Sequence, residues 1–153
     1  MKNVNADNRS AAETPSRWMI VDDSEEILSL MRDIIARFSD VEIKCFSSPQ
    51  NALAAFEAEP AAFEFVITDL EMPGMSGLEL SSRLRAFSPS LKILLSTGSE
   101  ILSNEEATQK GFCGLLRKPF PFAALQQALA PAALKYLKKF SGLNDGLRLV
   151  HVN

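Results

Sequence analysis

Cysteine and histidine are scarce in this sequence. The chain of 153 residues contains two cysteines, Cys45 and Cys113, and one histidine, His151. Two thiols are too few for a disulfide scaffold or for a zinc site with four thiolate ligands. The cysteine content therefore excludes both of these architectures.

The sequence also lacks a long apolar run, an apolar signal segment and an excess of positive charge. No stretch approaches the roughly 18–20 apolar residues of a membrane-spanning helix, and the N-terminus has no apolar core like that of a secretory signal peptide. Lysine and arginine number 16 against 19 aspartates and glutamates, a formal net charge of −3. Nucleic-acid-binding domains usually carry a basic face, and anionic membranes attract one. We therefore predict a soluble, cytoplasmic protein that contacts neither nucleic acid nor membrane directly.

Hydropathy divides the chain into three parts. Residues 1–16 are polar and predict a flexible leader, because they cannot bury enough surface to offset their ordering entropy. Residues 17–130 predict one globular domain. Residues 131–153 predict a C-terminal extension, with a short helix bearing Leu134, Leu137 and Phe140 and then a tail. We expect Pro131 to kink the preceding helix or to begin a second one.

Between residues 17 and 130, segments with the apolar pattern of strands alternate with segments that have the apolar spacing of helices. Apolar runs at 18–21, 65–67 and 93–95 predict buried strands, polar–apolar alternation at 42–46 predicts an edge strand, and 112–116 predicts a fifth strand. Helical spacing follows each strand, at 27–38, 49–56, 76–84, 103–110 and from 121 onward. This alternation indicates an α/β, doubly wound parallel sheet. If the two strands that carry Cys45 and Cys113 are opposite edges, no disulfide joins them.

Serine and glutamate stand three residues apart at the start of two of these helices. Ser76 with Glu79, and Ser103 with Glu106, have the spacing of a capping box. Both pairs therefore predict the points at which helices begin.

Four of the five predicted strands end in residues that suit one kind of chemistry. Asp22 and Asp23 end the first strand, Asp69 the third, Thr97 the fourth and Lys118 the fifth. Because ligands of such sheets bind outside the carboxyl ends of the strands, we expect these side chains to meet at one edge.

Three neighbouring carboxylates require a counter-charge. Two of them about 4 Å apart repel by about 4 kcal/mol at an effective dielectric constant of 20, so the cluster must take up a proton or a cation. Oxygen ligands on a partly open site suit Mg²⁺. An ionised carboxylate can also act as a nucleophile and form an acyl phosphate, while an ammonium and a hydroxyl neutralise the oxygens of a phosphoryl group in transfer.

Four motifs, in order and each at a strand end, resemble the receiver domain of two-component response regulators over roughly residues 17–129. They are Ile20-Val21-Asp22-Asp23, Thr68-Asp69-Leu70-Glu71-Met72-Pro73-Gly74-Met75-Ser76-Gly77, Leu94-Leu95-Ser96-Thr97-Gly98 and Arg117-Lys118-Pro119-Phe120. For the sheet we accordingly predict the flavodoxin-like strand order 2-1-3-4-5.

The resemblance implies a role for each site residue. Asp69 is the expected phosphoacceptor, with Thr97 and Lys118 binding phosphoryl oxygens. The phosphoryl donor is expected to be a sensor histidine kinase or a phosphotransfer protein. The peptide bond between Lys118 and Pro119 is usually cis in this family, and we expect it to be cis here. The protein would then be a signalling phosphoacceptor rather than an enzyme, apart from catalysing its own phosphorylation and slow dephosphorylation.

The same resemblance implies a Mg²⁺ site. Asp23 is the expected direct ligand, Asp22 acts mainly through water, and Asp69 and the backbone carbonyl of Glu71 complete the set. A purely structural alternative is that Asp22 and Asp23 cap the following helix, where free N–H groups and the helix dipole favour carboxylates.

The sequence departs from the family pattern at Leu115, where receivers usually carry Tyr or Phe. That ring moves inward when the hydroxyl residue engages the phosphoryl group, so transmission is expected to differ here. We expect activation to move mainly residues 98–102 and the start of the helix at 103–110. His151 is interpreted as incidental, because a donor histidine belongs on a long helix.

The leading hypothesis is a single-domain response regulator, monomeric or weakly dimeric, that signals by contacting an unknown output protein. One alternative is a receiver separated from a hybrid histidine kinase. Another is an aspartate-nucleophile phosphohydrolase, although that family places its nucleophile on the first strand. A third is a pseudo-receiver used only as a binding surface, against which the complete set of acids, Thr97 and Lys118 argues.

Overall fold

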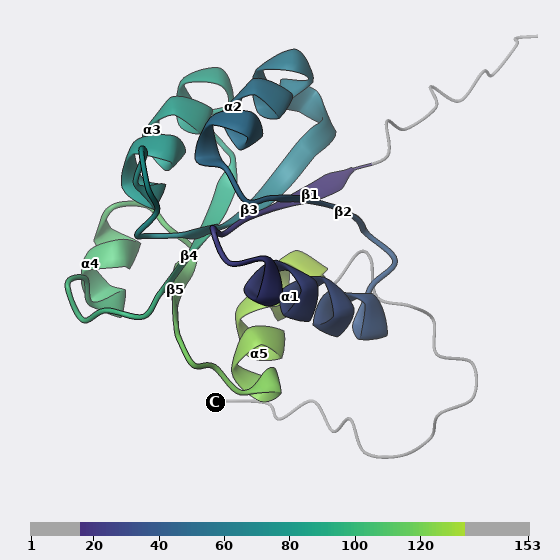
Figure 1. Cartoon of the computed structure of the whole chain (residues 1–153), viewed down its shortest axis with the longest axis vertical. Coiled ribbons are helices and arrows are strands. Elements are labelled where there is room, and N and C mark those ends of the chain that lie inside the picture. The colour runs from purple at the N-terminus through teal and green to yellow at the C-terminus, as the bar shows by residue number, and fades with distance from the viewer. Residues whose placement is uncertain (1–15, 134–153) are drawn as a thin grey trace, which may run out of the picture.

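The computed structural model describes residues 16–133, which form a five-stranded, all-parallel sheet between two layers of helices (Figure 1). The strand order is β2-β1-β3-β4-β5, as predicted. The elements are β1 (Arg17–Val21), α1 (Glu25–Phe38), β2 (Glu42–Phe46), α2 (Pro49–Ala58), a 3₁₀ turn (Pro60–Ala62), β3 (Phe63–Asp69), α3 (Gly77–Phe87), β4 (Lys92–Thr97), α4 (Asn104–Gln109), β5 (Gly114–Arg117) and α5 (Phe122–Ala133). No helix among the described residues has the length and hydrophobicity needed to cross a membrane.

The central strands are buried on both faces. β1, β3 and β4 are almost wholly buried, whereas every residue of the edge strand β2 is partly or fully exposed. Helices cover both faces of a parallel sheet, so its inner strands need apolar residues throughout. The expected edge position of residues 42–46 is therefore confirmed.

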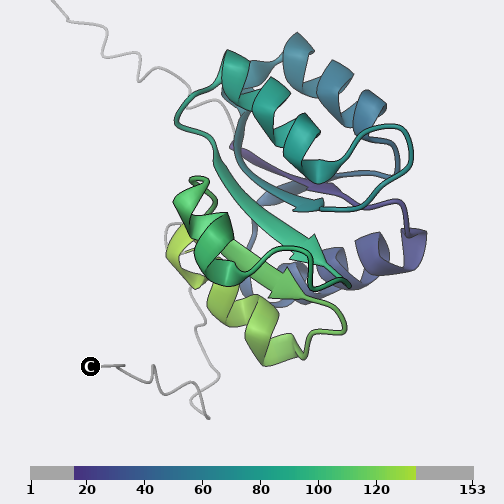
Figure 2. The same cartoon turned by 90° about the vertical axis from the view of Figure 1, so that its left-hand side faces the viewer.

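Two apolar cores lie on opposite faces of the sheet. α1 and α5 cover one face, while α2, α3 and α4 cover the other (Figure 1, Figure 2). Trp18 and Phe65 pack together beneath α1 and α5, with ring centroids 5.0 Å apart. Phe56 and Phe63 stack at 5.7 Å on the opposite face. These cores hold the strands in register and so fix where each strand ends.

Serine side chains begin four of the helices. Ser24, Ser48, Ser76 and Ser103 each accept a hydrogen bond from a backbone N–H in the first turn of the helix that follows. Only Ser103 and Glu106 form the full capping box. At the other predicted box, the Glu79 carboxylate pairs with Arg83 at 2.8 Å instead.

The cysteines lie at opposite edges of the sheet and are both free. Cys45 is in β2. Cys113 comes one residue before β5, which begins at Gly114, so its predicted place inside the strand was wrong. Its backbone N–H still donates to the Ile93 carbonyl at 2.9 Å.

The last helix extends past the predicted domain end at residue 130. α5 continues to Ala133 with Pro131 inside it, so within the described residues no second helix begins at the proline. Most of the predicted leader and extension, with Leu134, Leu137, Phe140 and His151, lies outside the described residues.

Candidate functional site

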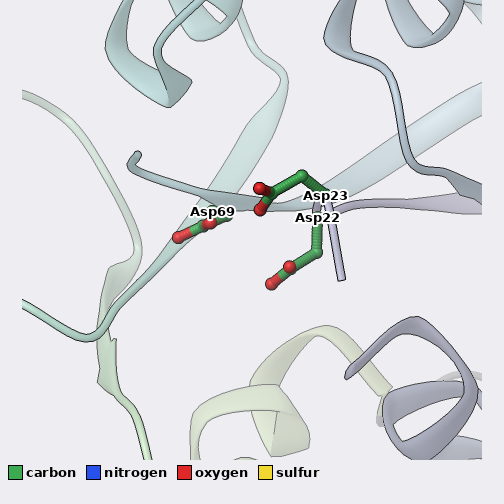
Figure 3. Close-up of side chains that lie close together, drawn as sticks. All are labelled: Asp22, Asp23 and Asp69. Atoms are coloured by element: carbon green, nitrogen blue, oxygen red, sulfur yellow. The ribbon is translucent and has the colours of Figure 1, made fainter. Parts of the chain in front are cut away.

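Three carboxylates meet at the carboxyl edge of the sheet. Asp22 and Asp23 directly follow β1, and Asp69 is the last residue of the neighbouring strand β3. Each offers an oxygen atom, and these atoms all lie within 4.8 Å of one another. Figure 3 shows the three side chains gathered at this end of the sheet. Asp22 and Asp69 are buried, whereas Asp23 is exposed.

The first turn of α1 explains why Asp22 points into the site. Ser24, not an aspartate, caps α1, because its hydroxyl accepts from the Ile27 N–H. Asp22 accepts from the Ser24 N–H through Oδ1 at 2.9 Å, and its own N–H donates to the Phe46 carbonyl at 3.1 Å. The capping interpretation of the Asp22–Asp23 pair is therefore unnecessary, since Ser24 already fulfils that role.

Lys118 pairs with both Asp22 and Asp69 at this edge. Its Nζ lies 2.6 Å from Asp22 Oδ2 and 3.5 Å from Asp69 Oδ1. It follows β5 directly, its N–H donates to the Thr97 carbonyl at 2.8 Å, and its bond to Pro119 is cis, as predicted. Lys118 thus pairs with two of the three clustered carboxylates, and its one positive charge does not balance the three negative charges of the cluster.

Burial raises the pKa of the Asp69 carboxyl above its ordinary value. The positive charge of Lys118 acts in the opposite direction, the negative charge of Asp22 adds to the rise, and an N–H bond from Glu71 lowers it. Both the burial and the neighbouring Asp22 disfavour the ionised form, so a further cation at this edge would stabilise it.

The donor set fits a hard divalent cation. Three carboxylates, one of them exposed, supply oxygen ligands on the side where solvent has access. Mg²⁺ prefers oxygen ligands and keeps several waters, so it suits a site that is only partly enclosed by protein.

The family of the chain follows from comparison with known proteins. The family model "Response regulator receiver domain" matches residues 18–130, which is most of the chain. The protein belongs to this family.

Curated relatives of this receiver domain include two bacterial regulators. It is 32% identical over 117 residues to the C4-dicarboxylate transport transcriptional regulatory protein DctD of Rhizobium meliloti, a match that covers 76% of this chain and 25% of that protein. It is also 32% identical over 123 residues to the response regulator protein FleR of Pseudomonas aeruginosa, covering 80% of this chain and 25% of that protein. The chain thus spans about a quarter of the length of these relatives.

Solved receiver structures share the fold. A response regulator receiver domain protein of Clostridium thermocellum has a TM-score of 0.69 at 25% identity, with 78% of this chain and 95% of that chain covered. The chemotaxis protein CheY4 of Vibrio cholerae has a TM-score of 0.64 at 28% identity, with 76% and 97% covered. Members of this family are signalling domains of two-component systems rather than enzymes in the usual sense.

The Thr97 hydroxyl of this receiver domain is hydrogen-bonded to Ser99, two residues further along the chain. Thr97 is buried at the end of β4, and its Oγ1 accepts from the Ser99 N–H at 3.0 Å and lies 3.2 Å from Ser99 Oγ. The adjacent Ser96 is paired in register with Asp69. Among the described residues, its Oγ is the buried side-chain polar atom that has no hydrogen-bond partner.

Sequence reasoning missed Gly77. The residue begins α3 and lies so close to Asp69 that a Cβ there would stand 3.0 Å from the Asp69 carbonyl carbon and still closer to its oxygen. Its N–H also donates to the Leu70 carbonyl at 2.9 Å. The signal in the sequence was a glycine eight residues after Asp69, but spacing alone does not reveal a close backbone approach.

Proposed function

We propose that residues 17–130 accept a phosphoryl group on Asp69, in a Mg²⁺-dependent reaction, from the phosphohistidine of a sensor histidine kinase or phosphotransfer protein. The observation that supports this most strongly is the position of Asp69, which shares one edge with two further carboxylates and lies 3.5 Å from the Lys118 ammonium. A nucleophilic carboxylate, a cation site and a fixed ammonium are the groups that phosphoryl transfer needs.

The transfer creates an acyl phosphate. An Asp69 carboxylate oxygen forms a bond to phosphorus while the bond from phosphorus to the donor imidazole nitrogen breaks, and the electron pair stays on that nitrogen. Lys118 neutralises one phosphoryl oxygen, and the Thr97 hydroxyl donates to another. Each of these groups matches a charge that develops on the equatorial oxygens during transfer.

Four groups of the chain would hold the metal. Asp23 would bind directly, Asp22 would act mainly through water, and Asp69 and the Glu71 carbonyl would complete the protein ligands. Bound Mg²⁺ supplies charge neutralisation between Asp69 and the incoming phosphoryl oxygens. Asp22 is already paired with Lys118, which is consistent with its acting through water rather than directly.

We further propose that the phosphorylated domain signals by contacting another protein, as a monomer or a weak dimer and without touching nucleic acid. The face formed by α4, β5 and α5 lies beside Thr97 and Lys118 and is the surface that modification would alter. A receiver that originates from a hybrid histidine kinase would use the same chemistry.

The test of this function is intact-mass measurement after incubation with acetyl phosphate. With Mg²⁺ present, the wild-type protein should gain the mass of one phosphoryl group and lose it in alkaline hydroxylamine, as an acyl phosphate does. Chelation of Mg²⁺ should prevent the gain. A protein that gains no mass under these conditions, or gains it equally without Mg²⁺, contradicts the proposal.

Replacing Asp23 should weaken the binding of Mg²⁺. In Asp23→Ala an oxygen ligand disappears. Even at about 4 Å in water, farther than a direct ligand lies, a divalent ion gains about 2 kcal/mol from a carboxylate, so a direct ligand contributes at least that much. We therefore expect the affinity for Mg²⁺, measured by calorimetric titration, to fall at least about tenfold. Asp33→Ala changes an exposed aspartate of α1 and is the matched control. Equal affinity in wild type and Asp23→Ala would show that Asp23 is not a ligand.

Replacing Lys118 should slow phosphoryl uptake without weakening the binding of Mg²⁺. In Lys118→Met the ammonium that pairs with Asp22 and approaches Asp69 is lost, so the carboxylates face no competing cation. We expect Mg²⁺ to bind at least as tightly as in wild type, while phosphoryl uptake from acetyl phosphate becomes slower. Calorimetry and time-resolved mass measurement give the two results. A loss of Mg²⁺ affinity like that of Asp23→Ala would mean that Lys118 serves mainly to arrange the ligands.

A further inference from the structure

One arginine holds the loop between β4 and α4 against the end of β5. Arg117 Nη1 donates to the Ser99 carbonyl at 2.7 Å, and Nη2 donates to the Leu102 carbonyl at 2.8 Å. The guanidinium is planar and its donors are fixed relative to one another, so it holds both carbonyls in one geometry. Arg117 itself is exposed, so its side chain has room to leave this position.

The same loop is bound to Thr97 from its other side. The Ser99 N–H donates to Thr97 Oγ1 at 3.0 Å, and the two hydroxyl oxygens lie 3.2 Å apart. Thr97, Ser99 and Arg117 therefore form a continuous chain of hydrogen bonds that starts at a buried hydroxyl of the site and ends on the surface. Any movement of Thr97 Oγ1 toward Asp69 either breaks its bonds to Ser99 or draws Ser99 with it. In the second case the Ser99 carbonyl moves away from Arg117, and the hydrogen bond between them breaks.

Leu115 is poorly suited to report such a movement. It is partly buried and packs against the core on the α3 and α4 side, and its N–H donates to Asn104 Oδ1 at 3.1 Å. Side chains two residues apart on a strand project from the same face, so Arg117 lies on the face of β5 that carries Leu115. Arg117 contacts the loop through hydrogen bonds, and these can exchange partners more readily than the packed Leu115 side chain can move.

We infer that Arg117 is a positioning residue that couples the state of Thr97 to the loop at 98–103 and thereby to α4. The inference rests on the proposed role of Thr97 in binding a phosphoryl group. The two bonds of Arg117 stabilise the loop of the unmodified protein, and they are lost when Thr97 draws Ser99 inward. A contact made in only one of two states shifts the equilibrium between them. Removing Arg117 therefore favours the state that binds the phosphoryl group.

The test measures the affinity for beryllofluoride, which stands in for the phosphoryl group, in the presence of Mg²⁺. Arg117→Met keeps the aliphatic stem and removes the donors, and we expect it to bind beryllofluoride about tenfold more tightly than wild type in an amide-shift titration. The amide shifts of residues 98–102 in the free variant should also move toward those of the beryllofluoride-bound wild type. Arg117→Lys, which keeps the charge but not the fork of donors, should show a smaller change in the same direction.

The chain offers a matched control in Arg85. Its guanidinium also donates to two backbone carbonyls, of Lys110 at 3.2 Å and Gly111 at 2.7 Å, but these lie at the far end of α4, away from the bonds that join Ser99 to Thr97. Arg85→Met removes the same charge and should leave the beryllofluoride affinity unchanged. In a Thr97→Val background, Arg117→Met should have no effect, because the hydroxyl that links the loop to the site is missing.

Three results would overturn the inference alone. They are an Arg117→Met affinity equal to or weaker than wild type, an equal tightening in Arg85→Met, and an Arg117 effect that persists in Thr97→Val. In each of these cases the wild-type protein still binds beryllofluoride and accepts a phosphoryl group, so the proposed function would stand. A wild type that does neither contradicts the proposed function first, and the role of Arg117 with it.

Discussion

Asp69→Asn should abolish phosphoryl uptake while leaving the domain folded. The amide is neutral and is not a nucleophile, so no acyl phosphate forms at this position. Folding should be retained because the change removes one negative charge from a cluster in which burial and Asp22 already disfavour the ionised Asp69. We therefore expect no gain of phosphoryl mass with acetyl phosphate and Mg²⁺, together with a melting temperature at least equal to that of wild type.

The control for this experiment is Asp33→Asn, which makes the same chemical change on the exposed side of α1. It should gain the phosphoryl mass as fully as wild type does. If Asp69→Asn still accepts phosphate in a hydroxylamine-sensitive form, another carboxylate is the acceptor and Asp69 has been assigned wrongly. Fragmentation of the modified protein would then locate the site.

Gly77→Ala should damage both the stability of the domain and its site. A Cβ at this position would stand 3.0 Å from the Asp69 carbonyl carbon and the Leu70 Cα, and closer still to the Asp69 carbonyl oxygen. All three atoms belong to the backbone at the end of β3, so α3 and β3 must move apart. Overpacking of this kind costs about 3 kcal/mol in the free energy of unfolding, which lowers the melting temperature by about 10 °C for a domain of this size.

The matched control is Gly98→Ala, because a Cβ there meets no atom within 4 Å. Thermal unfolding followed by circular dichroism should show a large loss of stability for Gly77→Ala and little change for Gly98→Ala. Since the displaced backbone carries Asp69, the Gly77 variant should also take up phosphate more slowly at temperatures where it remains folded. Equal melting temperatures for the two variants would mean that the approach of α3 to β3 is less tight than the structure shows.

Much of the fold could be predicted from local patterns. Hydrophobic period, strand length and capping residues are properties of short segments, and they predicted five strands, five helices and the edge position of residues 42–46. They failed at two details within helices. α5 continues through Pro131 to Ala133, so the second helix that the proline predicted as one of two outcomes does not begin there within the described residues. Glu79 pairs with Arg83 rather than closing the capping box.

Which residues stand at the carboxyl edge could be deduced from the sequence alone, because the strands of a parallel sheet all end at one edge and place their last side chains there. The meeting of Asp22, Asp23 and Asp69 follows from that rule. The pairing partners at this edge are a tertiary result: Lys118 lies 2.6 Å from Asp22, and Arg117 donates to the carbonyls of Ser99 and Leu102. The Ser24 cap of α1 is different, because it joins residues only three apart and is a local signal. Strand order sets neighbourhoods of several ångströms, whereas a hydrogen bond depends on tenths of an ångström. Those last distances arise from the packing of segments that are far apart in the chain, and no local pattern encodes them.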